Sequence, residues 1–142
     1  MDERPTIAIT MGDPAGIGPE IVAKALDLPS VTRFCRPFVI GCPEAIEDGI
    51  RIARTGSSVR TIQTVNDVFG DHTAIDVLEV GDLEHGKVAL GQVSAKAGKA
   101  AVEVVEEAAR MAMEKRVDAI VTCPINKEAV HLAGFKGDIG HQ

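Results

Sequence analysis

Two patterns of apolar residues follow each other in turn along this chain. Short apolar runs rich in β-branched residues are typical of buried strands, and they occur at residues 6–10, 37–41, 58–63, 74–80 and 117–122. Apolar residues spaced three or four apart are typical of one helix face, and they occur at residues 19–26, 43–53, 94–116 and 125–133. Strands that alternate with helices predict an α/β domain with a largely parallel sheet.

The segment 94–116 carries the strongest helix signal in the sequence. Ser94 can cap its beginning, and its interior is rich in Ala, Glu, Met and Val. The apolar face is made mostly of small side chains: Ala97, Ala101, Val104, Val105, Ala108, Met111 and Ala112. We therefore expect this helix to pack closely against a sheet or a neighbouring helix, and the next run, 117–122, to be a buried strand.

Composition narrows the class of protein. The chain has 142 residues, 45% of them hydrophobic and 25% charged, which suits one domain with an apolar core. The net charge of −6 argues against a nucleic-acid partner, since phosphate contacts need a basic face. The sequence shows no apolar stretch of membrane-spanning length and no signal-peptide pattern, so we expect a cytoplasmic protein without a membrane partner.

Neither the cysteines nor the histidines have the spacing of a metal site. Cys35, Cys42 and Cys123 are far apart, which favours small buried thiols in a reducing compartment. The GxSxG, HExxH and CxxC motifs are absent from the sequence. The polar tail, residues 136–142, leads into no helix or strand, so we expect the chain to be truncated.

The segment 12–20 follows the first predicted strand and leads into a helix. Gly16 and Gly18 allow tight backbone geometry, and the helix start presents free N–H groups to an anion. Gly and Pro are also ordinary turn residues, and the spacing is not that of the GxGxxG dinucleotide fingerprint. The pattern leaves a binding role and a plain turn both open.

A second polar group follows the run 117–122. Thr122, Asn126 and Lys127 bring a hydroxyl, an amide and an ammonium into one loop and helix start, which suits phosphate or carboxylate recognition. In the alternative interpretation, Thr122 only caps a helix and Lys127 is a solvated surface charge. His141, beside Gly140, can donate to a phosphate or titrate near neutrality, or it can be an ordinary surface residue.

Three motifs together resemble one enzyme family. They are MGDPAGIGPEI at 11–21, GKVALGQVSAKAGKAAVE at 86–103, and TCPINKEAVHLAG at 122–134 followed by Gly140 and His141. In this order they are similar to the 4-hydroxythreonine-4-phosphate dehydrogenase family of vitamin B6 (pyridoxine) biosynthesis. Around 122–134 the chain is more similar to a branch that oxidises four-carbon sugar-acid phosphates such as threonate or erythronate 4-phosphate.

The resemblance implies a fold and a reaction. The fold would be the three-layer α/β type of isocitrate and isopropylmalate dehydrogenases, with a parallel or mixed sheet. Residues 1–142 would be the amino-terminal portion of a two-domain homodimeric enzyme, its carboxy-terminal domain missing. The reaction would be NAD- or NADP-dependent oxidation and decarboxylation of a phosphorylated hydroxy acid, assisted by a divalent metal (Zn, Mg, Mn or Co).

The resemblance also implies some of the site residues. The family's Gly-His-Thr substrate-binding element falls on Gly140, His141 and Gln142. Gln142 in place of threonine leaves open which phosphorylated acid is the substrate. Lys127 lies in the family's cleft loop and is expected to contact substrate or phosphate, while Asp13 is assigned no chemical step.

The family's metal-binding histidines lie beyond residue 142, and no catalytic or cofactor-binding residue is assigned within the chain. We therefore expect the chain alone to be inactive. Two other classes remain open: an acyltransferase of the phosphotransacetylase type and a non-catalytic binding module.

Overall fold

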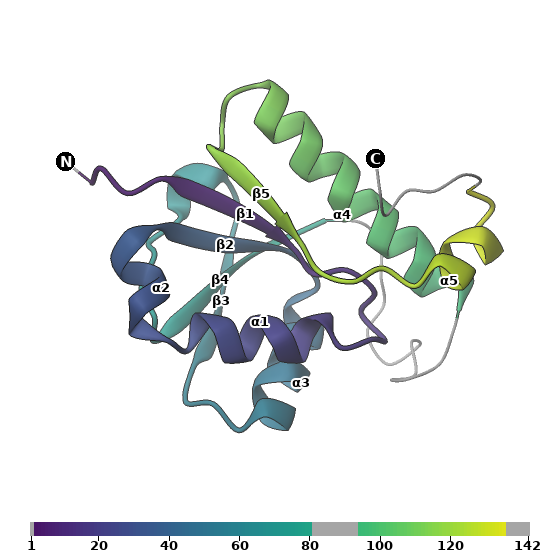
Figure 1. The fold of residues 1–142 in the computed structure, drawn as a ribbon, viewed down its shortest axis with the longest axis horizontal. Helices are drawn as coiled ribbons and strands as arrows, with labels where there is room; N and C mark the ends of the chain where they lie inside the picture. The colour runs from purple at the N-terminus through teal and green to yellow at the C-terminus, as the bar shows by residue number, and fades with distance from the viewer. Residues whose placement is uncertain (1, 81–93, 136–142) are drawn as a thin grey trace.

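The computed structural model describes residues 2–80 and 94–135, and this part of the chain forms a parallel sheet with helices on both faces (Figure 1). The strands are β1 (Thr6–Thr10), β2 (Arg36–Gly41), β3 (Ser58–Ile62), β4 (Ala74–Glu79) and β5 (Ala119–Thr122). The helices are α1 (Gly18–Leu26), α2 (Pro29–Phe34), α3 (Pro43–Ala53), α4 (Ala95–Met113) and α5 (Lys127–Leu132), with a 3-10 turn η1 (Val65–Asp67). The predicted α/β fold with a parallel sheet is confirmed. Residues 81–93 and the predicted polar tail, residues 136–142, lie outside the described residues.

The strand order is β3-β4-β2-β1-β5, and every described pairing is parallel. At the carboxyl end of β1, Thr10 lies opposite Ile40 of β2 on one side and Thr122 of β5 on the other. The chain leaves β1 toward β2, whereas the connection from β4 crosses the sheet to reach β5. The gap between β1 and β5 is therefore a topological switch point, where open α/β sheets form their ligand sites.

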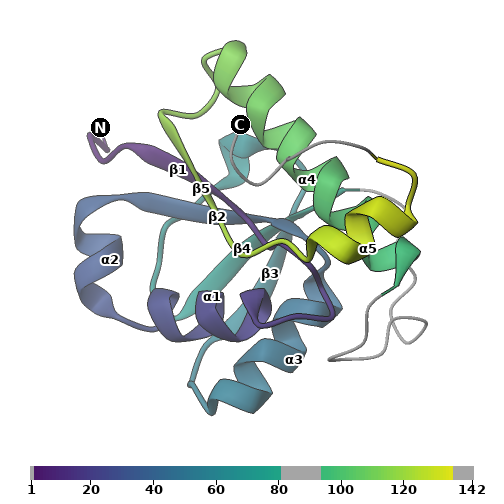
Figure 2. The same ribbon diagram turned by 45° about the vertical axis from the view of Figure 1, so that its right-hand side comes forward.

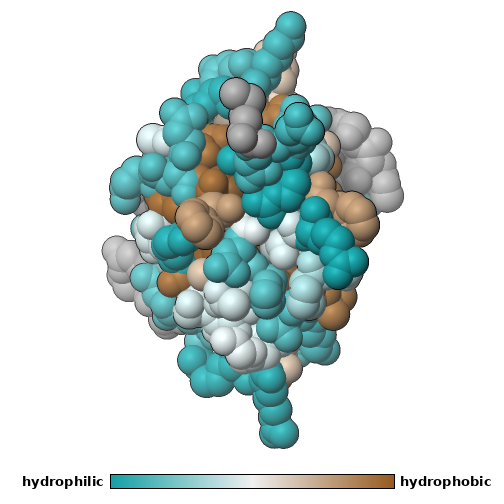
Figure 3. All heavy atoms as spheres, turned by 90° about the vertical axis from the view of Figure 1, so that its left-hand side faces the viewer, coloured by the Kyte–Doolittle hydropathy of each residue, from teal (hydrophilic) through white to brown (hydrophobic). Residues whose placement is uncertain are grey.

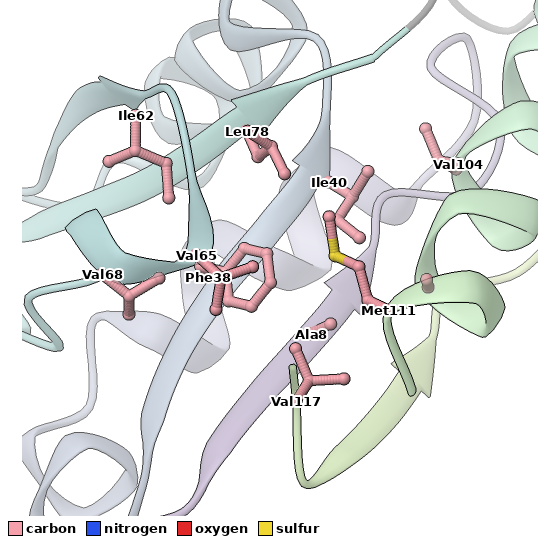
Figure 4. Close-up of a cluster of buried hydrophobic side chains, with 11 residues drawn as sticks. Ala8, Phe38, Ile40, Ile62, Val65, Val68, Leu78, Val104, Met111 and Val117 are labelled. Carbon is pink, nitrogen blue, oxygen red and sulfur yellow. The ribbon is translucent and has the colours of Figure 1, made fainter. Parts of the chain in front are cut away.

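Each face of the sheet has its own hydrophobic cluster. Helices α1 and α3 cover one face, and α4 covers the other (Figures 1 and 2). On the α1 and α3 side the buried cluster consists of Met11, Val22, Leu26, Val39, Cys42, Ala45, Ile46, Ile75, Val77 and Cys123. On the α4 side, Val104 and Met111 point toward Phe38 and Ile40 of β2 and Ala8 of β1 (Figure 4).

Helix α4 begins where the sequence predicts and ends earlier. The Ala97 N–H donates to Ser94 Oγ at 3.1 Å, so Ser94 is the cap. The helix ends at Met113 because Lys115 adopts a left-handed conformation, φ 60°. The Lys115 N–H then donates to Ala112 O and the Arg116 N–H to Met111 O, which is the Schellman arrangement. The spacing could not predict this end, because Lys and Arg are good helix formers.

The close packing expected of α4 is confirmed, and the neighbour is α5. A Cβ atom on Gly98 would lie 2.1 Å from the Ala129 carbonyl oxygen, so the two backbones approach more closely than any side chain allows. Figure 2 shows α5 lying across the first turns of α4. This contact holds α5 beside the carboxyl end of the sheet.

The prediction that the run 117–122 is a buried strand was wrong for β5. All four of its residues are exposed, and Val121 is 52% exposed. The reason is position: within the described residues β5 is an edge strand, with β1 on one side. An apolar run does not reveal whether its strand is central or at an edge.

Two short elements were not predicted. Helix α2 begins at Pro29, a position that proline suits. The turn η1 has a capping box in which Thr64 and Asp67 satisfy each other's backbone N–H groups. Both elements are too short to show a periodic apolar pattern.

Apolar side chains also reach the surface. Figure 3, which faces the side that carries the N-terminus and α2 in Figure 1, shows brown apolar patches between polar side chains. Phe34 of α2 is 71% exposed, and a single exposed aromatic of this kind is common on protein surfaces. Among the helices within residues 2–80 and 94–135, none combines the length and the apolar character needed to cross a bilayer.

Candidate functional site

The loops that follow β1 and β5 are joined by backbone hydrogen bonds. The Cys123 N–H donates to Thr10 O at 3.0 Å, and the Asp13 N–H donates to Pro124 O at 3.3 Å. Gly12 has φ +78°, and a Cβ atom there would lie 2.4 Å from Pro124 O. Glycine is required at position 12 both by its conformation and by this contact.

The loop after β1 folds back so that its beginning, at Met11, contacts Gly18 at the start of α1. A Cβ atom on Gly18 would lie 2.0 Å from the Met11 carbonyl oxygen. The loop therefore turns tightly and places residues 13–17 over the loop after β5. Gly12 and Gly18 serve this backbone geometry, whereas a Cβ atom on Gly16 would make only ordinary contacts, 3.4 Å or more from its neighbours.

A cleft of about 260 Å³ lies between the two loops. The first loop contributes Asp13, Ala15, Gly16 and Ile17, and the second contributes Pro124, Ile125 and Asn126. The cleft is thus at the carboxyl ends of β1 and β5, at the switch point of the sheet. Its walls are largely apolar, and the polar side chains among these lining residues are those of Asp13 and Asn126.

Asp13 is a carboxylate held almost entirely inside the protein, 3% exposed. Its Oδ1 accepts a hydrogen bond from the Ala15 N–H at 2.8 Å, and its carbonyl oxygen accepts from the Gly16 N–H at 2.9 Å. Burial raises the pKa of the Asp13 carboxyl, and the Ala15 hydrogen bond offsets part of that rise. The sequence assigned Asp13 no role, because nothing in a single sequence indicates that an acidic residue in a polar turn is buried.

Asn126 is the cap of α5. Its Oδ1 accepts from the Ala129 N–H at 3.0 Å, so the helix start is satisfied by Asn126 and not by Thr122, which ends β5. The alternative interpretation of Thr122 as a helix cap was wrong. Since the capping bond uses the amide oxygen, the two N–H groups of Asn126 Nδ2 are directed elsewhere.

The predicted substrate-binding residues are not all placed by the structure. Lys127 is the first residue of α5, next to Asn126, and it is exposed and outside the set that lines the cleft. Gly140, His141 and Gln142 lie outside the described residues.

The charge of the cleft does not suit an anion. Among the described residues that line it there is no Lys, Arg or His, and there is one carboxylate, Asp13. A second acidic residue, Glu20, lies in the first turn of α1. Although the start of α1 offers backbone N–H groups, Glu20 lies at this positive end of the helix and Asp13 lies in the loop before it, and both carboxylates disfavour a phosphate nearby. Of the two interpretations left open for the segment 12–20, the charges of the described residues favour a turn over an anion site.

Cysteine chemistry is not favoured in the described part of the chain. Cys42 and Cys123 are buried as predicted, whereas Cys35 is half-buried. Burial and the hydrogen bond to Glu44 raise the pKa of Cys42 to about 11, and burial raises the pKa of Cys123 behind the cleft. Residues 2–80 and 94–135 contain no grouping of three His, Cys, Asp or Glu side chains that could hold a metal ion.

Comparison with known proteins gives a consistent result. A family model described as pyridoxal phosphate biosynthetic protein PdxA matches residues 33–142. D-threonate 4-phosphate dehydrogenase of Cupriavidus necator is 39% identical over 135 residues, covering 95% of this chain and 40% of that protein. 4-Hydroxythreonine-4-phosphate dehydrogenase of Desulforapulum autotrophicum is 38% identical over 135 residues, with the same coverage.

The fold of this chain is also similar to that of a solved structure. The 4-hydroxythreonine-4-phosphate dehydrogenase from Burkholderia phymatum superimposes with a TM-score of 0.88 at 38% identity, covering 94% of this chain and 40% of that one. The chain thus spans about 40% of the length of the relatives it matches. With its parallel sheet, its joined loops and the match over residues 33–142, the chain belongs to the family of the pyridoxal phosphate biosynthetic protein PdxA.

Proposed function

We propose that this chain forms the amino-terminal part of a dehydrogenase that oxidises a four-carbon phosphorylated hydroxy acid. The substrate class is that of its relatives, which are threonate 4-phosphate and 4-hydroxythreonine-4-phosphate dehydrogenases. The observation that carries the proposal is the cleft at the carboxyl ends of β1 and β5, built by two of the three motifs that resemble the family. The family comparison also favours this function over an acyltransferase and over a binding module.

The activity is proposed for a longer protein. Because the relatives are about two and a half times as long as the matched part, we propose that the chain alone does not turn over substrate. A carboxy-terminal domain would complete an isocitrate-dehydrogenase-type fold, and a homodimer would place the active site between two domains.

The described residues fit the nicotinamide end of a cofactor. Ile17, Pro124 and Ile125 offer an apolar wall to a flat ring, and Asp13 and Asn126 offer polar partners. When bound, the nicotinamide of NAD or NADP accepts the hydride from the substrate. The contribution of this chain is to hold the ring and to keep water from one side of it.

The described residues do not fit a divalent metal, since they contain no suitable grouping of side chains. We propose that metal assistance and decarboxylation depend on residues outside the described part of the chain. Within this chain we propose Lys127, His141 and Gln142 as contacts for the phosphorylated acid. The ammonium of Lys127 follows directly after the cleft residue Asn126, and lysine is a common phosphate ligand.

A chimera tests the proposed function. In it, this chain replaces the matching amino-terminal 40% of the Cupriavidus necator relative. We expect the chimera to reduce NAD or NADP with D-threonate 4-phosphate or 4-phosphohydroxythreonine, in the presence of a divalent metal. The two substrates and the two cofactors are assayed in parallel, with and without a chelator.

The chain alone and the carboxy-terminal part alone serve as controls, and neither is expected to show turnover. A chimera that has the circular dichroism and the size of the folded relative, yet oxidises neither acid, would sink the proposal. Turnover by the 142-residue chain alone would overturn the proposed need for a second domain.

A further inference from the structure

The cleft is lined by one hydrogen-bond acceptor, Asp13, and one donor, Asn126, among largely apolar residues. Asp13 supplies carboxylate oxygen, and within the described residues its carboxylate accepts one hydrogen bond, from the Ala15 N–H to Oδ1. Asn126 supplies the N–H groups of Nδ2, because its Oδ1 is engaged in capping α5. The two residues belong to loops held together by the bond from the Asp13 N–H to Pro124 O.

We propose that this cleft recognises the carboxamide of the nicotinamide ring, with Asp13 accepting from the amide nitrogen and Asn126 donating to the amide oxygen. The inference rests on the proposed function and deepens it by assigning two specificity-determining residues. A carboxamide carries a donor and an acceptor side by side, which matches this pair. The apolar side chains of Ile17 and Ile125 suit the faces of the ring.

The charge of the described lining residues disfavours the anionic groups of the reactants. A phosphate or a substrate carboxylate would lie against the Asp13 carboxylate without a cation among the described lining residues, and like charges in contact are strongly disfavoured. The ring and the substrate must meet, and the loop after β5 carries both Asn126, in the cleft, and Lys127, the proposed substrate contact. This favours the nicotinamide end of the cofactor over the adenine end.

The test compares amide and acid forms of one ligand. The 142-residue chain is titrated with nicotinamide mononucleotide, nicotinic acid mononucleotide and AMP, and backbone amide shifts are followed by NMR. Nicotinic acid differs from nicotinamide by a carboxylate in place of the carboxamide. We expect the amide form to bind at least about tenfold more tightly, with shifts centred on residues 13–17 and 124–126, since Asp13 repels the acid.

Two variants separate recognition from folding. Asp13→Asn removes the charge and keeps an oxygen for the Ala15 N–H, so the preference for the amide form should fall to about threefold or less. Asn126→Asp keeps a good helix cap and removes the donor, so the amide form should bind more weakly while α5 stays folded. Glu47→Gln, an exposed charge on α3, is the matched control and should leave the preference unchanged.

Several results would overturn the inference. One is an Asp13→Asn variant in which the ratio of the affinities for the amide and acid mononucleotides is unchanged. A second is the absence of amide shifts at residues 13–17 and 124–126 with nicotinamide mononucleotide. A third is that AMP, and not nicotinamide mononucleotide, causes shifts at the cleft that change in the two variants. These readouts do not depend on turnover. An active chimera with an unresponsive cleft would refute the inference alone, and an inactive folded chimera would refute the proposed function alone.

Discussion

At the scale of single residues, Asp13 is a carboxylate whose side chain is almost entirely buried at the cleft. The pKa of this carboxyl lies above its ordinary value of 3.8 because burial disfavours the charged form. A raised folded-state pKa means that the contribution of Asp13 to stability is fully present below the unfolded pKa. It is lost as the pH rises through the folded pKa. The carboxylate therefore costs stability at neutral pH.

The loss of stability caused by the charged Asp13 carboxylate predicts how the Asp13→Asn variant behaves. The variant is neutral at every pH and keeps an oxygen for the Ala15 N–H, so its stability relative to the parent chain should increase from pH 4 to pH 7. Urea unfolding at several pH values in this range measures the difference. A constant difference across the range would mean that Asp13 is not destabilised by burial.

Substitution of Lys127 tests the proposed substrate contact most directly. If its ammonium holds the phosphate in the active chimera, Lys127→Ala should raise KM about tenfold or more, since charge-assisted hydrogen bonds contribute roughly 1.5–3 kcal/mol. Lys24→Ala, an exposed lysine on α1, is the matched control. Steady-state kinetics with the phosphorylated acid measures both, and unchanged KM and kcat would remove Lys127 from the site.

At the scale of elements, the contact of α4 with α5 depends on one glycine. A Cβ at Gly98 would meet the Ala129 carbonyl oxygen at 2.1 Å, and the atoms it meets are backbone, which cannot rotate away. Alanine is favoured over glycine in a helix by about 1 kcal/mol. Overpacking costs about 1–3 kcal/mol, so the clash should win.

Gly98→Ala should accordingly lower the free energy of unfolding, although the same change usually stabilises a helix. Gly56→Ala is the control, since nothing lies within 4 Å of a Cβ at that position. Urea denaturation of both variants gives the comparison. A Gly98→Ala chain that is more stable than the parent would show that α5 does not pack on α4 as closely as described.

A substitution at the end of α4 is expected to raise the free energy of unfolding. Lys115 has φ 60°, a conformation that costs a residue with a side chain about 1 kcal/mol and costs glycine almost nothing. Lys115→Gly loses a favourable charge at the helix end, worth about 0.3 kcal/mol on an exposed site. The variant should gain about 0.7 kcal/mol in the free energy of unfolding.

Lys115→Ala separates the two effects. It loses the same charge and keeps a side chain in the left-handed conformation, so it should be slightly less stable than the parent. Thermal and urea unfolding of the three chains test the order Gly, Lys, Ala. Any order in which alanine exceeds glycine contradicts the Schellman ending.

At the scale of the whole molecule, the position of the cleft follows from the strand order. Segments after β1 and β5 meet because these two strands are neighbours in the sheet, although they lie at opposite ends of the sequence. Gly12 and Pro124 lie in contact at that junction. The cleft is therefore a property of the sheet topology, and the two family-like motifs that border it take part in one site.

The amino-acid sequence by itself determined the elements and the family. β1 and α3 have the predicted bounds, and Ser94 caps α4 as expected, because strand and helix periodicity and capping are local properties of the chain. Family membership also follows from the sequence, since the family model matches residues 33–142 and the three ordered motifs resemble the same family.

Only the tertiary structure decided which residues form the site and in what environment. It buried Asp13, made Asn126 the cap in place of Thr122, and left β5 exposed at an edge. Each of these outcomes depends on which distant segment lies beside a residue. Local spacing of apolar and polar residues carries no information on such contacts. The charge and shape of the cleft therefore depend on the tertiary structure, which brings the loops after β1 and β5 together.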